Sequence, residues 1–217
     1  MYFCIIKQKN REPDSFLYLG IFVTLNHLYT TMILPVYLYG HPVLRKEAED
    51  IDKDYPDLKQ LIDDMFETMY HSEGVGLAAP QIGKSINLIV IDGDPVKEHF
   101  PECENLKLTL INPEFEIIKD SDPVTRDEGC LSLPGLSEAV KRYEHIRLNW
   151  LDENFEEKEQ EFTGFAARII QHELDHLIGK VYTDHISPIR KQLIKTKLNN
   201  ISKGKVSCDY RTKGAHS

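Results

Sequence analysis

Apolar residues recur at helical spacing in three stretches of the chain. In residues 55–74 these positions are held by Leu58, Leu61, Ile62, Met65 and Met69. A proline suits the first turn of this helix and a glycine can end it. Residues 164–179, flanked by glycines, predict a second helix, and residues 187–201 predict a third that is amphipathic and basic.

Other stretches alternate or cluster as strands do. Residues 85–93 predict a mostly buried strand, and residues 106–118 predict a pair of strands interrupted at Asn112 and Pro113. Residues 145–162 predict a hairpin with a polar turn at 152–154. Because strands outnumber helices and short turns join most of them, we expect an α+β fold with largely antiparallel sheets.

The chain of 217 residues, 41% of them hydrophobic, is long enough for one well-buried core. Residues 16–25 are apolar and follow a basic stretch, as in a signal peptide. Two acidic residues precede them, no small-residue cleavage site follows, and ten residues are too short to span a bilayer. We therefore expect residues 1–31 to be an extension that is disordered or not part of the native product, and no membrane association.

The overall charge and the cysteines narrow the function classes further. A net charge of −9 disfavours a protein that wraps nucleic acid as a whole. No CxxC pair or disulfide framework is present, which favours reduced cysteines in the cytosol. The four cysteines are Cys4, Cys103, Cys130 and Cys208.

The sequence QHELDH (171–176) lies within the second predicted helix. His172 and His176, four residues apart, share a helix face and can present imidazole nitrogens to one metal ion. Glu173 projects about 100° away, where a general base belongs. The alternative is two unrelated histidines on a helix. That helix is otherwise apolar, so its buried polar groups need partners.

Two histidines do not complete a catalytic metal site, which usually has three protein ligands and one open position. Carboxylates, distant histidines and thiols are all candidates for the third ligand. EGCLSLPG (128–135) contains Cys130, which is either a ligand or a small buried apolar residue. GVGLAAPQIG (74–83) offers glycines for close backbone approach and Gln81 as a neutral amide donor. Taken alone, that stretch is an ordinary helix-to-strand loop.

The three stretches together resemble the peptide deformylase family, whose pattern is GxGLAAxQ, then EGCLS, then QHExDH. The chain has GVGLAAPQ, EGCLS and QHELDH in that order, and the resemblance extends from about Ile33 to about His185. It implies a metal-dependent bacterial hydrolase that removes the formyl group from the initiator methionine of new proteins and releases formate. We expect antiparallel sheets packed around the central HExxH helix, with a catalytic domain at 32–186 and a basic helix and tail at 187–217.

The resemblance also implies roles for single residues. Cys130 would join His172 and His176 in binding Fe²⁺, with Zn²⁺, Ni²⁺ or Co²⁺ able to substitute. Glu173 would take the proton of the attacking water and return it to the departing amine. The side-chain amide of Gln81 and the backbone N–H of Leu131, with the metal, would stabilise the developing oxyanion.

By the same resemblance, the formylmethionyl substrate would lie extended along exposed backbone. The residues expected to contact it are Gly74, Val75, Gly76, Gly129, Phe165 and Ile169. Val75, Phe165 and Ile169 would line the methionine pocket.

Further expectations concern the partners and the exposure of three arginines near the motifs. Arg142 would pair with Glu128 of the second motif. Arg126 and Arg168 stand where some members are apolar, so we expect their stems to pack near the pocket while their charges reach water.

Several alternatives compete with this interpretation. A zincin peptidase also uses HExxH, but a further ligand at the usual spacing downstream is missing. A metal-binding domain without activity would need a closed four-ligand site, and an inactive family paralogue would have lost a motif. We expect a cytoplasmic monomer whose basic C-terminal segment either contacts ribosomal RNA or is a solvated tail.

Overall fold

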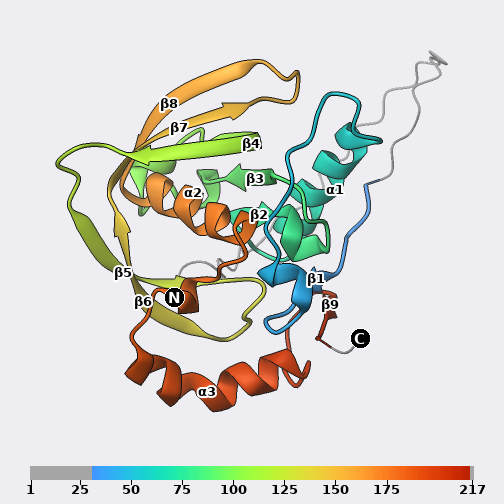
Figure 1. The fold of residues 1–217 in the computed structure, drawn as a ribbon, viewed down its shortest axis with the longest axis vertical. Helices are drawn as coiled ribbons and strands as arrows, with labels where there is room; N and C mark the ends of the chain where they lie inside the picture. Colours follow the sequence, from blue (N-terminus) through green and yellow to red (C-terminus); the bar gives the residue numbers. More distant parts are fainter. Residues whose placement is uncertain (1–30, 216–217) are drawn as a thin grey trace, which may run out of the picture.

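The computed structural model describes residues 31–215. The expected N-terminal extension therefore lies, except for Thr31, outside the described residues. An antiparallel sheet of order β2-β3-β4-β7-β8 forms the body of the molecule (Figure 1). Its strands are β2 (Gly76–Ala78), β3 (Leu88–Asp92), β4 (Lys107–Ile117), β7 (His145–Leu151) and β8 (Glu157–Thr163). The helices are α1 (Leu58–His71), α2 (Gly164–Leu177) and α3 (Pro188–Ser202).

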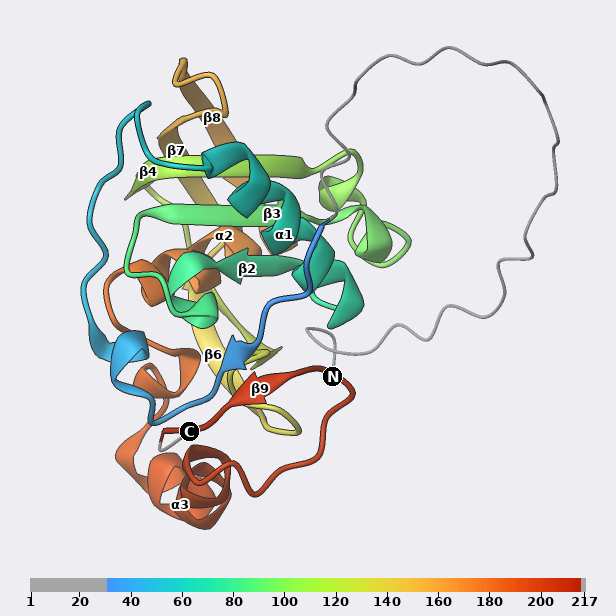
Figure 2. The same cartoon turned by 90° about the vertical axis from the view of Figure 1, so that its right-hand side faces the viewer.

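Two smaller sheets complete the fold. The strands β5 (Pro123–Gly129) and β6 (Ser137–Tyr143) form an antiparallel hairpin. The strand β1 (Val36–Tyr37) pairs in parallel with β9 (Thr212–Lys213), close to α3 (Figure 2). The expected α+β class, with a central HExxH helix and a C-terminal helix, is confirmed.

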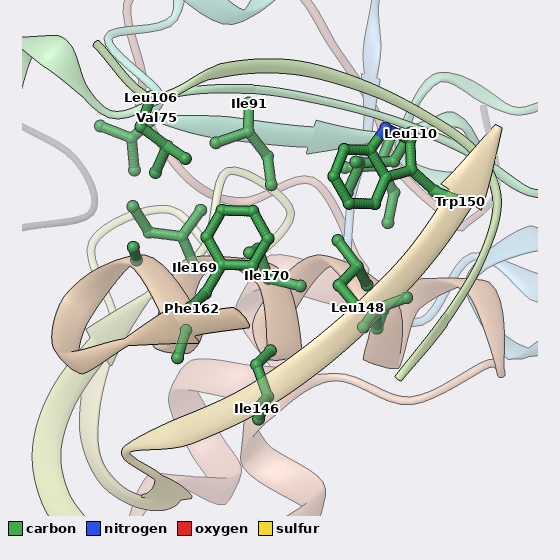
Figure 3. Packing of buried hydrophobic residues seen from close by; sticks show 14 of the residues in the cluster. Val75, Ile91, Leu106, Leu110, Ile146, Leu148, Trp150, Phe162, Ile169 and Ile170 are labelled. Atoms are coloured by element: carbon green, nitrogen blue, oxygen red, sulfur yellow. The ribbon is translucent and has the colours of Figure 1, made fainter. Parts of the chain in front are cut away.

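Alternation along β3 explains why a helix packs on each face of the large sheet. Ile89 and Ile91 belong to the apolar cluster that contains the α2 residues Ile169 and Ile170. Figure 3 shows this cluster between α2 and the sheet. Leu88 and Val90, which point to the opposite face, pack with α1. The helix α2 is buried from residue 165 to 177 because the hairpin β5–β6 covers its other side.

The expected pair of strands at 106–118 is wrong, because one continuous strand, β4, occupies this region. Its first half pairs with β3 and its second half with β7, and the register shifts between Ile111 and Glu114. Asn112 lies in this bulge at a φ of 48°. Its side chain accepts from Ile51 N at 3.0 Å and donates to Ile51 O at 2.8 Å. A positive φ suits Asn, so the bulge replaces a turn.

The stretch 74–83 is also more ordered than a simple loop. It contains β2, which pairs with β3, and the short 3-10 helix η2 (Ala79–Ile82). The hairpin at 145–162 is confirmed as β7 and β8.

The C-terminal segment packs onto the stretch that contains the second motif. Ile194, Leu198 and Ile201 of α3 share an apolar cluster with Cys130. The Tyr210 hydroxyl donates to Leu131 O at 2.7 Å. Among residues 31–215, no helix has both the length and the apolar composition needed to cross a membrane.

Candidate metal centre

Two elements meet at the residues of the second and third motifs. Cys130 directly follows β5, and His172 and His176 lie on one face of α2. Their potential ligand atoms all lie within 4.8 Å of one another. The Cys130 Sγ is 3.3 Å from Nε2 of His176. All three side chains are buried, so the group is shielded from water.

The donor set fits a divalent metal. Nδ1 of His172 lies 2.9 Å from Glu128 Oε2, which leaves Nε2 of this ring for a metal. A carboxylate on the outer nitrogen is the usual arrangement for a metal-binding histidine, since it fixes the tautomer and the ring. One thiolate and two imidazoles suit Fe²⁺, Co²⁺, Ni²⁺ or Zn²⁺.

The electrostatics favour the ligand form of the thiol. Burial raises the pKa of Cys130, but His176 and His172 outweigh it and lower that pKa to about 5. Burial lowers the pKa of His172, yet Cys130 and Glu128 raise it well above the ordinary value. A bound cation therefore competes with protons at this cluster, so metal binding releases them.

Glu128 is fully buried beside the proposed ligands. Arg142 donates to both of its oxygens at 3.0 Å, which confirms the expected pair. Arg168 Nη1 donates to Oε1 at 2.7 Å. Hydrogen bonds from His172 and Arg142 outweigh burial and hold the pKa of this carboxyl far below its usual range. Glu128 is therefore an anion that anchors His172.

The charges of Arg126 and Arg168 are both expected to reach water, and this expectation holds only for Arg126. The Arg126 side chain is 43% exposed and lies 3.6 Å from Glu144. The Arg168 side chain is 0% exposed, so the expectation is wrong for this residue. Its guanidinium is buried because Glu128 and two backbone carbonyls accept its hydrogen bonds.

Glu173 is buried immediately beside β2. A Cβ added to Gly76 would lie 2.5 Å from Glu173 Oε1, so only glycine leaves room for this carboxylate. Glu173 Oε2 has no hydrogen-bond partner among residues 31–215. Burial raises the pKa of Glu173 to about 7. A carboxylate with that pKa can both accept and release a proton near neutral pH.

Gln81 and Leu131 flank the thiol. Gln81 Oε1 accepts from Ala78 N at 2.8 Å, which turns Nε2 toward Cys130 Sγ and Ser132 Oγ, both at 3.4 Å. The Leu131 N–H has no acceptor among residues 31–215. The structure thus brings both predicted oxyanion donors next to the cysteine.

The expected pocket residues share one apolar cluster. Val75, Phe165 and Ile169 are all buried in it, and Figure 3 shows Val75 facing Ile169. A Cβ on Gly74 would approach Leu131 Cδ1 to 3.0 Å, so the Leu131 side chain packs directly against the backbone of Gly74.

Sequence reasoning missed two residues, Phe100 and Glu102, that contact the start of α2. The Phe100 ring stacks on Phe165, with the centroids 3.8 Å apart. Glu102 Oε1 accepts from the backbone N–H of Phe165 at 2.7 Å and so caps the helix. The sequence HFPEC gives only a weak signal for these contacts, because they join residues more than sixty positions apart.

Comparison with known proteins decides the family. The family model described as polypeptide deformylase matches residues 33–192. The chain belongs to the polypeptide deformylase family. Its activity is therefore removal of the N-formyl group from the initiator methionine of new proteins, with release of formate. The predicted hydrolase is confirmed, and the peptidase and binding-module alternatives are excluded.

Individual relatives and solved structures agree with the family match, because each of them is a peptide deformylase. The chain is 46% identical to the peptide deformylase of Christiangramia forsetii, over 83% of this chain and 95% of the relative. It is likewise 46% identical to the peptide deformylase of Flavobacterium psychrophilum, over 84% of this chain and 97% of the relative. The crystal structure of peptide deformylase from Thermus thermophilus matches with a TM-score of 0.69 and 36% identity, covering 80% of this chain and 99% of that one. The crystal structure of peptide deformylase from Thermotoga maritima matches with a TM-score of 0.63 and 38% identity, covering 72% of this chain and 99% of that one.

Proposed function

We propose that Cys130, His172 and His176 bind a single Fe²⁺ ion, for which Zn²⁺, Ni²⁺ or Co²⁺ can substitute. The observation that carries this proposal is the convergence of one thiol and two imidazoles within 4.8 Å. Glu128 supports it by occupying Nδ1 of His172. A set of three ligands leaves a position open for catalysis.

When bound, such a metal supplies Lewis acidity and lowers the pKa of water toward neutrality. Glu173 takes the proton of the water that adds to the formyl carbon. It then returns the proton to the amine nitrogen as the C–N bond breaks, which yields formate and a free methionine amino group. A pKa of about 7 for Glu173 supports this double role, because both protonation states are populated at neutral pH.

Gln81 and Leu131 stabilise the negative charge that develops on the formyl oxygen. The side-chain amide of Gln81 is held in place by its bond from Ala78 N, so little reorganisation is needed during the reaction. The Leu131 N–H supplies the second donor.

The substrate peptide extends along the backbone of residues 74–76 and Gly129. The methionine side chain enters the apolar cluster beside Val75, Phe165 and Ile169. Backbone pairing supplies affinity for any sequence, and this pocket supplies preference for methionine. Because Gly74 and Gly76 have no side chains, they keep the approach to the backbone open.

A matched peptide assay tests the proposed chemistry. Protein prepared anaerobically should release formate from formyl-Met-Ala-Ser and leave unformylated Met-Ala-Ser intact. Cleavage of an internal peptide bond, or no formate release by protein that contains one metal per chain, would contradict it.

The catalytic unit is proposed to be residues 32–186, with residues 187–217 as a basic helix and tail. The backbone N–H of Met32 donates to Asp64 at 2.7 Å, and that of Leu34 donates to Thr68 at 2.9 Å. These bonds join the start of this unit to α1. Protein that begins at Met32 should therefore keep full activity.

The enzyme is proposed to act as a cytoplasmic monomer on nascent chains, with α3 in contact with the ribosome. Lys195 and Lys197 are exposed on α3, and the buried side of this helix packs near Cys130. Deleting α3 would therefore disturb the site itself, and charge reversal is the better test. Lys195→Glu with Lys197→Glu should weaken ribosome co-sedimentation.

The matched control reverses Lys53 and Lys59, which are exposed on and before α1. Equal binding by both double variants would remove α3 from the proposed contact. Binding by the parent protein should also fall steeply with added salt, since phosphate contacts release counterions.

A further inference from the structure

Glu128 collects four hydrogen bonds although it is fully buried. Arg142 donates to both oxygens, Arg168 donates to Oε1, and His172 contacts Oε2. The direction of the His172 ring therefore depends on where this carboxylate is held. Whatever fixes Glu128 also fixes one of the three proposed metal ligands.

Arg168 joins the two elements that carry the proposed ligands. It lies on α2 one turn before His172, on the same helix face. Its Nη1 donates to Val140 O of β6 at 3.0 Å, and its Nη2 donates to Val124 O of β5 at 2.6 Å. One side chain thus links α2 to both strands of the hairpin that carries Glu128 and leads into Cys130.

The charges show why Arg142 alone cannot replace this contact. Arg142 divides its guanidinium between Glu128 and Asp175, the latter at 2.6 Å. His185 also contacts Asp175, and it is about one third exposed. Arg168 makes its only ion pair with Glu128 among residues 31–215. Without Arg168, two buried carboxylates would share one guanidinium, which leaves a buried charge poorly compensated.

We propose that Arg168 is a positioning residue of the metal centre: by fixing Glu128 against the β5–β6 hairpin, it orients His172 toward the metal. It contacts neither the proposed ligand atoms nor the reacting groups. The inference rests on the proposed metal centre of the preceding section. It assigns a role to an arginine that sequence reasoning expected to reach water.

Zinc affinity tests this role without relying on activity. Full-length protein is depleted of metal, and zinc binding is measured by competition with a chromophoric chelator. Arg168→Met keeps most of the stem but loses the charge and all donors. We expect its zinc affinity to fall about tenfold or more, the range seen when an outer partner of a metal ligand is removed. Arg168→Lys, which keeps the charge without the fork, should lose less.

Thr68→Val is the matched control for a loss of stability alone. Thr68 is fully buried on α1, and its hydroxyl donates to Asp64 O at 2.7 Å and accepts from Leu34 N. This helix packs on the sheet face opposite α2. The control should lower the melting temperature and leave zinc affinity unchanged.

Nitrogen NMR of the zinc-loaded protein gives a second readout. The Nδ1–H of His172 should be protected from exchange in the parent protein and exchange faster in Arg168→Met. Parent-like zinc affinity in Arg168→Met would overturn the inference, as would an equal loss in Thr68→Val. If Arg168→Met does not fold, parent-like affinity in Arg168→Lys overturns it instead. Failure of the parent protein to bind one zinc would refute the proposed metal centre, so the two failures are distinguishable.

Discussion

Gly76→Ala places one methyl group against the proposed general base. The new Cβ would lie 2.5 Å from Glu173 Oε1 and 2.8 Å from Cδ and Cγ of the same side chain. Ordinary contacts are close to 3.5 Å, so the carboxylate must move by about 1 Å. Glu173 is 2% exposed and has little free space to enter.

Two consequences follow from this displacement. Overpacking of a buried site costs about 1–3 kcal/mol of stability. A misplacement of about 1 Å in a reacting group costs on the order of a hundredfold in turnover. We therefore expect Gly76→Ala to lower the melting temperature and to reduce kcat for formyl-Met-Ala-Ser about a hundredfold, with the metal retained.

A double-variant cycle assigns the effect to Glu173. In a Glu173→Ala background the added methyl has room, so Gly76→Ala should no longer destabilise the protein. Gly214→Ala is the control, because its nearest contact would be an ordinary 3.4 Å. Normal turnover in Gly76→Ala, or an equal loss of stability in both backgrounds, would refute the proposed contact.

Three further predictions concern single groups. Glu173→Gln should retain metal but lose about a hundredfold or more in turnover, since an amide cannot accept the proton; near-normal turnover would assign the base elsewhere. Cys130 should resist alkylation until a chelator is added, and Cys130→Ser should bind metal more weakly; protection that chelation does not relieve would mark a structural cysteine. Burial raises the pKa of Asp184, but hydrogen bonds from Arg45, the Val181 N–H and Lys191 outweigh it and lower that pKa to about 2. Because the folded pKa lies below the ordinary 3.8, the ionised carboxylate stabilises the fold fully well above pH 3.8, and this stabilisation is lost as pH falls through about 2. Solvent screening of the half-exposed Arg45 limits this stabilisation to about 1 kcal/mol. The free energies of unfolding in urea of the parent and Asp184→Asn should therefore differ less as pH falls over that window; a difference at pH 2 as large as that at neutral pH would contradict the ion pair.

The sequence predicted what local patterns determine. The period of apolar residues gave all three helices, and the spacing of His172 and His176 predicted one helix face with two imidazoles. The hairpin β7–β8 followed from alternation with a polar turn. Each of these depends on residues close together in the chain.

The sequence could not predict features that depend on distant contacts. The strand β4 remains continuous because the Asn112 side chain bonds to Ile51, which is 61 positions away. Arg168 is buried because carbonyls of β5 and β6 accept its hydrogen bonds. Cys130 could be chosen as a ligand only through family resemblance, since its approach to α2 is set by the packing of the β5–β6 hairpin.

X-ray absorption at the metal edge tests the central claim most directly. The claim is that one thiolate and two imidazoles of this chain hold a single catalytic metal. Zinc-loaded protein should show one sulfur scatterer at about 2.3 Å and two nitrogens at about 2.0–2.1 Å, with a light atom completing the site. The sulfur should disappear in Cys130→Ser. A first shell without sulfur in the parent protein, or one with four protein ligands and no open position, would contradict the account.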